Sequence, residues 1–153
     1  MATSPLTDAL VQLSFAVQGA IGRVAELHDL SHVQVRLLGI LRDREPAMLA
    51  LAAHLKLDKS SVTGLVDRAE ARGLVRRKMT PGDGRTVRVA LTERGRKLTQ
   101  KLAALVEHEL AALVGELSAA ERKRLLSLAG RIIDGDVRRR LPEGASSGGT
   151  PGT

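Results

Sequence analysis

The chain has 153 residues, with 24 Lys or Arg against 17 Asp or Glu and a formal net charge of +7 at pH 7. This length is about that of one domain and is long enough to bury a hydrophobic core. The sequence has no cysteine, which excludes disulfides, thiol redox sensing and cysteine-ligated zinc. It also has no apolar run of the roughly 18 to 20 residues of a membrane span and no signal-peptide pattern, so we expect a cytoplasmic protein without a membrane partner.

Residues 1–30 predict one long amphipathic helix. The helix can begin at Ser4-Pro5 or at Thr7, because serine and threonine cap a first turn and proline fits inside it. Apolar residues then recur every three or four positions, at Leu10, Leu13, Val17, Ala20, Val24 and Leu27. A stripe this narrow must be covered by another helix, and the segment alone leaves open whether that helix belongs to the same chain or to a second copy.

Two shorter helices are predicted next. The first runs from about Ser31 to Leu41, with an apolar face made by Val33, Leu37, Leu38 and Leu41. After a charged loop, Met48 to Leu55 predicts the second helix, with Leu49, Ala52, Ala53 and Leu55 packing against the helix that follows. The few residues before Asp58 leave only a tight turn, as a helix-turn-helix motif requires.

A third helix is expected to begin after Asp58 as its N-cap and to end at Gly73. Its inward face is Val62, Leu65, Val66 and Ala69. The outward side chains are mostly short: Ser60, Ser61, Thr63, Gly64, Asp67, Arg68 and Ala71. Such a face suits the major groove of DNA, about 12 Å wide, because it lets the backbone come close to phosphates and bases. An ordinary solvated face has a similar composition, so the next segment must decide.

That segment predicts a two-stranded wing. Leu74 to Met79 and Thr86 to Leu91 are typical of strands, and the second strand alternates apolar with polar residues. Between them lies Thr80-Pro81-Gly82-Asp83-Gly84-Arg85, a turn in which Asp83 can hold Arg85 extended toward the narrow minor groove of DNA. A turn of this kind alone is more often a solvated hairpin, but directly after a short-residue helix it favours a DNA-binding wing.

Residues 93–140 predict two further helices. Thr92 caps the first, which continues to about Leu117, and Ser118 to Glu121 forms a capping box for the second. Both carry apolar residues beyond the needs of one small module, including Leu110, Ile132, Ile133 and Val137. Residues 141–153, rich in Gly, Ser, Thr and Pro, are expected to form a disordered tail.

The charge is concentrated in one part of the chain. Residues 54–97 hold twelve Lys or Arg against five Asp or Glu, and the rest of the chain holds twelve of each. All of the net charge therefore lies in residues 54–97, which span the predicted recognition helix and wing. A basic patch confined to one module is the expected footprint of a nucleic-acid binder, since neutralising phosphates supplies most non-specific affinity.

These motifs together resemble the winged helix-turn-helix core of the MarR family of bacterial transcription regulators. The matching stretches are Ser60-Ser61-Val62-Thr63, Arg72-Gly73-Leu74-Val75-Arg76-Arg77, Asp83-Gly84-Arg85 and Leu91-Thr92-Glu93-Arg94-Gly95. The resemblance implies a mainly α fold with a small β-wing: a winged helix-turn-helix module, residues 31–92, joined to an all-helical N- and C-terminal dimerisation lobe. It also implies a homodimer whose terminal helices interleave with those of a second copy.

Two positions depart from the pattern of the family. Lys56 stands where a glycine is frequent in the helix-helix turn, which predicts modest local strain. Gly64 stands where a larger, often basic, residue is common, which predicts fewer base contacts.

The sequence is interpreted as that of a sequence-specific regulator that binds double-stranded DNA, a repressor that binds a palindromic operator as a homodimer. The resemblance adds a small-molecule inducer; no cofactor is expected. Thr63, through its methyl group, and Arg68 are expected to read bases, while Arg85, oriented by Asp83, enters the minor groove. Gly64 lies on the same DNA-facing surface, and the residues expected at phosphates are Lys59, Ser60, Ser61, Arg76, Arg77 and Arg88.

Other functions have less support in the sequence. No nucleophile with a base, glycine-rich phosphate loop or catalytic carboxylate pair stands out, so an enzyme is not expected. A non-specific architectural DNA-binding protein is the main alternative. His28, His32 and His108 lie near carboxylates and leave a metal-responsive regulator as a further one, although their spacing defines no ligand set and no metal site is assigned.

Overall fold

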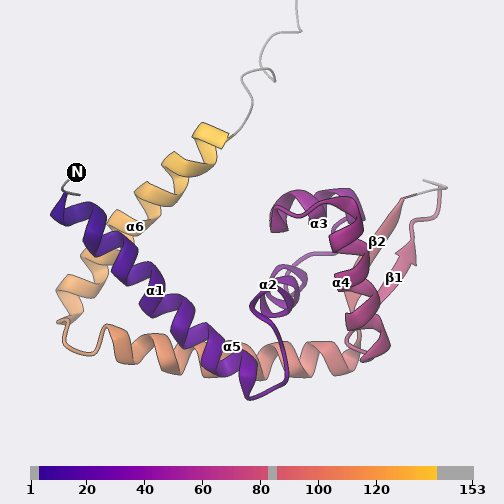
Figure 1. Ribbon diagram of the computed structural model, residues 1–153, viewed down its shortest axis with the longest axis horizontal. Helices are drawn as coiled ribbons and strands as arrows, with labels where there is room; N and C mark the ends of the chain where they lie inside the picture. Colours follow the sequence, from indigo (N-terminus) through magenta and orange to yellow (C-terminus); the bar gives the residue numbers. More distant parts are fainter. Residues whose placement is uncertain (1–3, 83–85, 141–153) are drawn as a thin grey trace, which may run out of the picture. The chain divides into compact units, whose positions relative to one another are not determined.

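The computed structural model describes residues 4–82 and 86–140, which form six helices and one two-stranded antiparallel sheet (Figure 1). The chain divides into two compact units, residues 1–113 and residues 114–153. The elements of the first unit are α1 (Pro5–Glu26), α2 (His32–Leu41), α3 (Met48–Leu55), α4 (Lys59–Ala71), β1 (Val75–Met79), β2 (Val87–Leu91) and α5 (Glu93–Leu113). The second unit contains α6 (Ala119–Arg140). Among the described residues, no helix combines the length and apolar character needed to cross a membrane.

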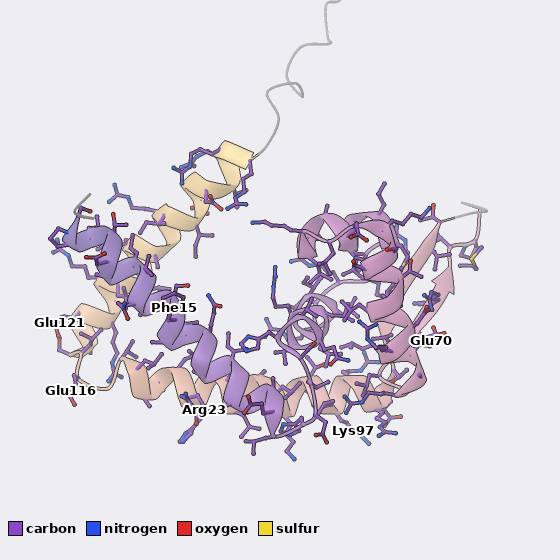
Figure 2. All side chains as sticks on the ribbon, in the orientation of Figure 1. Phe15, Arg23, Glu70, Lys97, Glu116 and Glu121 are labelled. Carbon is purple, nitrogen blue, oxygen red and sulfur yellow. The ribbon has the colours of Figure 1, made fainter. Side chains whose placement is uncertain are left out.

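The long first helix is capped as its sequence predicts, and only part of its apolar stripe is packed within the chain. The Ser4 side chain accepts a hydrogen bond from the Thr7 backbone N–H at 3.1 Å, and Pro5 occupies the first turn. Toward its C-terminal end α1 packs against α5, where Ala20 and Val24 are buried. Arg23, labelled in Figure 2, adds an ion pair to Glu109 of α5 at 2.9 Å. The apolar stripe is therefore covered within the chain at Ala20 and Val24, while Leu10 and Leu13 nearer the N-terminus are exposed. Leu27, expected on the same stripe, is also exposed because the helix ends at Glu26.

The core of the first unit lies among α2, α3, α4 and the sheet. Ser31 and Gln34 form a reciprocal capping box at the start of α2, which buries Leu37, Leu38 and Leu41. The predicted inward face of α4 is confirmed, since Val62, Leu65, Val66 and Ala69 are all buried. These side chains join one cluster with Val24 and Ala25 of α1, Val75 and Val89 of the sheet and Leu102 of α5. Burial of this cluster fixes α4 with its other face outward.

The expected packing of α3 is wrong in part. Leu51 and Leu55, four residues apart, are the buried pair of this helix, whereas Leu49 is 82% exposed and Ala53 also faces outward. The phase of the helix is set before it begins. Ala47 forms an isolated bridge with Arg88 of β2, and α3 starts directly after it, so Leu51 rather than Leu49 points to the core.

The turn between α3 and α4 contains the predicted strain. Lys56 is in the left-handed region with φ +54°, where a residue with a side chain is less favourable than glycine. Its backbone N–H and that of Leu57 still reach carbonyls of α3, those of Ala53 at 3.3 Å and Ala52 at 3.1 Å. The turn therefore keeps the geometry that glycine would give, and Lys56 adopts the conformation directly.

The two strands confirm the predicted wing to within one residue at each start. They pair antiparallel from Val75 opposite Leu91 to Met79 opposite Val87. The segment before α3 adds a partial third edge, because the Val89 N–H donates to the Pro46 carbonyl at 3.0 Å. This addition could not be predicted from strand periodicity, since it involves only the extended backbone at Pro46 and Ala47.

The start of α5 is fitted closely onto the backbone just before β1. Thr92 caps the helix by accepting from the Gly95 N–H at 2.9 Å and donating to the Gly73 carbonyl at 2.6 Å. A Cβ on Gly95 would lie 1.8 Å from the carbonyl oxygen of Leu74, so the two backbones meet only because residue 95 is glycine. α5 ends at Leu113, four residues earlier than expected.

The second unit is built on α6. The capping box is confirmed: the Ser118 N–H donates to the Glu121 carboxylate at 2.8 Å and the Glu121 N–H to the Ser118 hydroxyl at 3.3 Å. These bonds lower the pKa of the Glu121 carboxyl, first through the Ser118 backbone N–H. No described residue of α6 is buried within the single chain, and Leu126, Ile132, Ile133 and Val137 are exposed.

Candidate nucleic-acid interface

The outward helix α4 begins with a strong N-terminal cap. The Asp58 carboxylate accepts the Ser61 backbone N–H at 2.8 Å, the Ser61 hydroxyl at 3.0 Å and the Ser60 hydroxyl at 3.0 Å. These hydrogen bonds lower the pKa of Asp58, with the Ser61 backbone bond as the largest cause. The charged cap stabilises the positive end of the helix dipole. It also means that both hydroxyl protons expected at phosphates are donated to Asp58 in this structure.

The rest of the outer face of α4 is exposed and short, as predicted. The Thr63 hydroxyl donates to the Lys59 carbonyl at 2.9 Å, which leaves the Thr63 methyl group available for contacts on the outer face. Gly64 makes room for Arg68 one turn later, since a Cβ on Gly64 would lie 3.3 Å from an Arg68 guanidinium nitrogen. Arg68 thus lies back along the helix over the glycine. Lys59 is exposed and forms no ion pair with any described residue.

The base of the wing is held by Arg88 and Glu45. The Arg88 guanidinium donates to the Thr80 hydroxyl at 3.1 Å and to the Glu45 carbonyl at 3.1 Å. The Glu45 carboxylate is 2.8 Å from the Lys78 ammonium, and this hydrogen bond is the largest cause that lowers the pKa of Glu45. Arg88 was expected at a phosphate, and the structure places it in this network on the sheet.

Arg77 joins the wing to the recognition helix. Its guanidinium lies 2.6 Å from the Asp67 carboxylate and 3.3 Å from that of Glu70, which Figure 2 labels on α4. Both partners come from the outer side of the helix, and the Arg77 side chain is 28% exposed. These ion pairs offset the charge that Arg77 would bring to a phosphate. Arg76, its neighbour on β1, is exposed and lies close enough to Glu45 to help lower the pKa of that carboxyl.

The tip of the wing is only partly described. Gly82 has φ +88°, which fits a tight turn and requires glycine's freedom. The predicted minor-groove pair, Asp83 and Arg85, lies outside the described residues. Its orientation therefore stays a prediction.

One contact of Arg72 was not predicted from the sequence, although Arg72 belongs to the motif that resembles the family. Arg72, the C-cap of α4, donates through one nitrogen to the Asp29 carbonyl at 2.8 Å and through another to the His28 carbonyl at 3.2 Å. Both carbonyls belong to the connector between α1 and α2. Local sequence patterns give no signal for a contact between residues more than forty positions apart.

A cavity of about 150 Å³ lies between α2 and α5. Its walls are mainly aliphatic, and its polar side chains are Arg42 and the buried Thr99. The lining residues are Val35, Leu38, Gly39, Arg42, Thr99, Leu102, Ala103 and Val106. The Arg42 guanidinium pairs with Asp43 at 3.0 Å, and the Thr99 hydroxyl donates to the Gly95 carbonyl at 2.7 Å.

The histidines that raised a metal-responsive alternative have other surroundings. The Nδ1 of His28 is 3.1 Å from the Val24 carbonyl, and the His32 ring lies over Gly22, where a Cβ would come within 2.6 Å of Nε2. Across residues 4–82 and 86–140, no group of three or more His, Cys, Asp or Glu side chains is arranged to hold a metal ion.

Comparison with known proteins places this arrangement among transcription regulators. A MarR family model matches residues 28–86. The chain is 35% identical over 109 residues to the HTH-type transcriptional repressor NicR of Pseudomonas putida KT2440, covering 71% of this chain and 69% of that protein. The crystal structure of MarR superposes with a TM-score of 0.77 at 25% identity, over 92% of this chain and 97% of that one. CouR from Rhodococcus jostii RHA1, solved bound to p-coumaroyl-CoA, gives a TM-score of 0.71 at 25% identity, over 84% of this chain and 92% of that one.

These relatives are transcription regulators and not enzymes, and the residues that the family model matches include α2, α3, α4 and β1. The chain therefore belongs to the MarR family of transcription regulators.

Proposed function

We propose that this regulator is a homodimeric repressor that binds a palindromic operator in double-stranded DNA and is released by a small molecule. The observation that carries the proposal is the pairing of α4, with its short polar outer face, and an adjacent wing in the segment that holds all of the net positive charge. A helix of this kind enters the major groove, while a charged wing follows the backbone into the neighbouring minor groove. In a symmetric dimer the two α4 helices would meet successive major grooves, about 34 to 36 Å apart.

The side chains divide into four proposed roles. Thr63 and Arg68 read base edges, with Gly64 giving Arg68 its space; Lys59 and Arg76, both exposed, contact phosphates. Arg85 enters the minor groove with Asp83 orienting it. Residues whose side chains already have partners within the chain contribute chiefly by fixing the shape of the surface. Ser60 and Ser61 do so through the α4 cap, Arg77 by linking β1 to α4, and Arg88 by its hydrogen bond to the Glu45 carbonyl.

The homodimer is supported by apolar surface that the single chain leaves uncovered. In the first unit, Leu6, Leu10, Leu13 and Phe15 of α1 are exposed, and Phe15 projects from the helix in Figure 2. In the second unit, α6 exposes Leu126, Ile132, Ile133 and Val137. So many exposed large apolar side chains on two helices are unusual for a monomer and typical of an isologous dimer interface.

The inducer is supported by the cavity between α2 and α5. At about 150 Å³ it is comparable to a cavity that holds one benzene-sized ring. Its aliphatic walls suit an apolar body, and Arg42 at its lining suits an anionic group, so the ligand class proposed is a small apolar acid. α2 packs on α3, and α5 packs on β2, so a ligand that spreads α2 from α5 would favour a placement of α4 unsuited to the operator.

Binding to DNA tests the proposal directly. DNA from immediately upstream of the gene and a scrambled duplex are titrated by fluorescence anisotropy across a salt series. The proposal predicts a ratio of about 10³ or more in favour of the upstream DNA and a steep salt slope. Equal affinity for both duplexes, with genome-wide selection yielding no preferred site, would instead establish an architectural DNA-binding protein.

The wing needs a separate test because Asp83 and Arg85 lie outside the described residues. Arg85→Ala should weaken binding to operators with A-tract flanks more than to operators with GC flanks, since a narrow minor groove attracts an inserted arginine. Asp83→Asn serves as the matched variant for the orienting role. Equal losses on both flanks would contradict insertion.

A further inference from the structure

Beyond the residues that face DNA, we propose that Arg72 is a positioning residue that fixes the recognition helix α4 against the C-terminal end of the dimerisation helix α1, and so sets the half-site spacing that the dimer accepts. The inference rests on the proposed function for its DNA readout. It stands on the geometry of one guanidinium and two consecutive carbonyls, those of His28 and Asp29.

The two carbonyls that Arg72 binds are held rigidly by the end of α1. The N–H groups of His28 and Leu30 both donate to the Ala25 carbonyl, at 3.0 and 2.9 Å, and the Asp29 N–H donates to Glu26 at 3.2 Å. Asp29 itself is in the left-handed region, with φ +53°, which terminates the helix sharply. Leu30 is then buried in the core. The connector is therefore a fixed anchor.

Arg72 binds two carbonyls that lie just beyond the end of α1, at positions where the chain has left the helix. The C-terminal end of a helix carries partial negative charge, which favours a cation beside it. A planar guanidinium can give two separate N–H groups to two neighbouring oxygens, at 2.8 and 3.2 Å here, whereas a lysine ammonium offers only a point charge. The contact thus depends on the shape of arginine as well as on its charge.

Arg72 holds the C-terminal end of α4, so a tilt of the helix about this end displaces its N-terminal end most. α4 has 13 residues, so it is about 20 Å long, and the proposed DNA contacts begin at its N-terminal end. A tilt of about 5° at Arg72 moves that end by about 2 Å, comparable to the rise of one base pair, about 3.4 Å. In a dimer the displacement occurs in both copies.

The other end of the connection is the helix that carries the proposed dimer face. α1 is tied to α5 by Arg23 and Glu109 at 2.9 Å, and its N-terminal half exposes Leu10, Leu13 and Phe15. Arg72 is consequently a direct polar link between the DNA-reading helix and the dimerisation helix. Arg68 and Arg76 cannot form this link, because their side chains lie on the outer surface.

The first test is a distance measurement without DNA. Because the chain has no cysteine, Gln12→Cys on α1 and Ser61→Cys on α4 can be spin-labelled selectively, with labelled chains diluted in unlabelled ones so that distances within one chain dominate. Arg72→Ala should broaden the distance distribution and Arg72→Lys should broaden it less. Arg44→Ala, which removes one exposed loop charge, should leave it as narrow as in the parent. A distribution equally narrow in Arg72→Ala would overturn the proposal whatever the protein binds.

The second test uses operators that differ only in the distance between half-sites. One added base pair separates the half-sites by about 3.4 Å. The parent should prefer its own spacing, and Arg72→Ala and Arg72→Lys should reduce that preference about threefold or more without changing the salt slope. If Arg72→Ala lowers affinity for both spacings equally and flattens the salt slope by about 0.9 per half-site, about 1.8 for the dimer, Arg72 contacts a phosphate and the proposal is wrong.

The two failures remain distinguishable. A parent protein that shows no preference for any operator contradicts the proposed function, while the distance measurement still decides the role of Arg72. If Arg72→Ala does not fold, as judged by circular dichroism, Arg72→Lys carries both tests, because it keeps the charge and loses only the two-carbonyl fork.

Discussion

Replacing Gly95 by alanine tests how the first unit is assembled. The new Cβ would lie 1.8 Å from the Leu74 carbonyl oxygen and 2.8 Å from its carbon, and both are backbone atoms that cannot rotate away. That carbonyl also accepts the Thr92 N–H at 3.1 Å, at the junction that places α5 beside α4 and the wing. The substitution must therefore separate the start of α5 from the backbone at Leu74, just before β1.

The expected cost can be worked from these contacts. Overpacking against an immovable group costs about 3 kcal/mol, and weakening the Thr92 hydrogen bond adds about 1 kcal/mol. Alanine returns about 1 kcal/mol through its better helix propensity, which leaves a net loss of about 3 kcal/mol. For a protein of this size that loss lowers the melting temperature by about 6 to 12 °C.

Thermal unfolding at fixed protein concentration, followed by circular dichroism, measures the effect. Gly39→Ala in α2 is the matched control, because a Cβ there meets nothing within 4 Å and the change should stabilise by about 0.5 to 1 kcal/mol. A Gly95→Ala protein as stable as the parent would refute the close approach of the two backbones.

Three further changes probe the cap, the wing and the dimer face. Hydrogen bonds lower the pKa of Asp58 in the folded state, so its carboxylate stabilises the fold above the ordinary Asp pKa of about 3.9, and this stabilisation is lost as pH falls through the lower folded pKa. Asp58→Asn should keep the cap but reduce this loss of stability in acid. An unchanged pH profile of the melting temperature would contradict the role given to Asp58. Arg77→Ala should reduce operator affinity mainly by releasing β1 from α4, and a double-mutant cycle with Asp67→Asn should show a stability coupling of about 1 kcal/mol, whereas additive losses would show that the 2.6 Å pair is not energetically linked. Ile133→Lys in α6 changes a side chain that is 60% exposed in the single chain, so a monomer should tolerate it to within about 0.5 kcal/mol, whereas a dimer interface should dissociate in sedimentation; Ser127→Lys is the control.

The sequence predicted the elements best where local chemistry and periodicity agree. Asp58 and Gly73 bound α4 as expected, and the buried residues of this helix repeat at helical spacing. The Ser118 and Glu121 box likewise marks the start of α6. In each case the signal lies within a few residues, so no knowledge of the tertiary structure was required.

The prediction failed where a distant segment decides the local geometry. Leu49 and Leu51 are equally apolar, and only the bridge from Ala47 to Arg88 sets which of them faces the core. The same limit applies to the intrachain partners of charges on the wing. The contact of Arg88 with the Glu45 carbonyl and that of Arg77 with a carboxylate of α4 could not be predicted from the sequence, and the phosphate contacts expected of both arginines stay predictions.

At Gly95 the residue could be recognised from the sequence, but its physical role could not. The motif that includes Thr92 and Gly95 is part of the family resemblance, yet its physical reason emerges only from the contact with Leu74. Arg72 is similar, since its place in the motif is visible in the sequence while its two carbonyl partners on the α1–α2 connector are not.

The measurement that tests the central claim most directly is the salt-dependent affinity for the DNA upstream of the gene against scrambled DNA. The predicted result is a ratio of about 10³ or more with a steep salt slope. Arg68→Ala should reduce the ratio, and Arg76→Ala should reduce the salt slope. A ratio near one on upstream DNA and on every fragment recovered by genome-wide selection would contradict an operator-specific regulator.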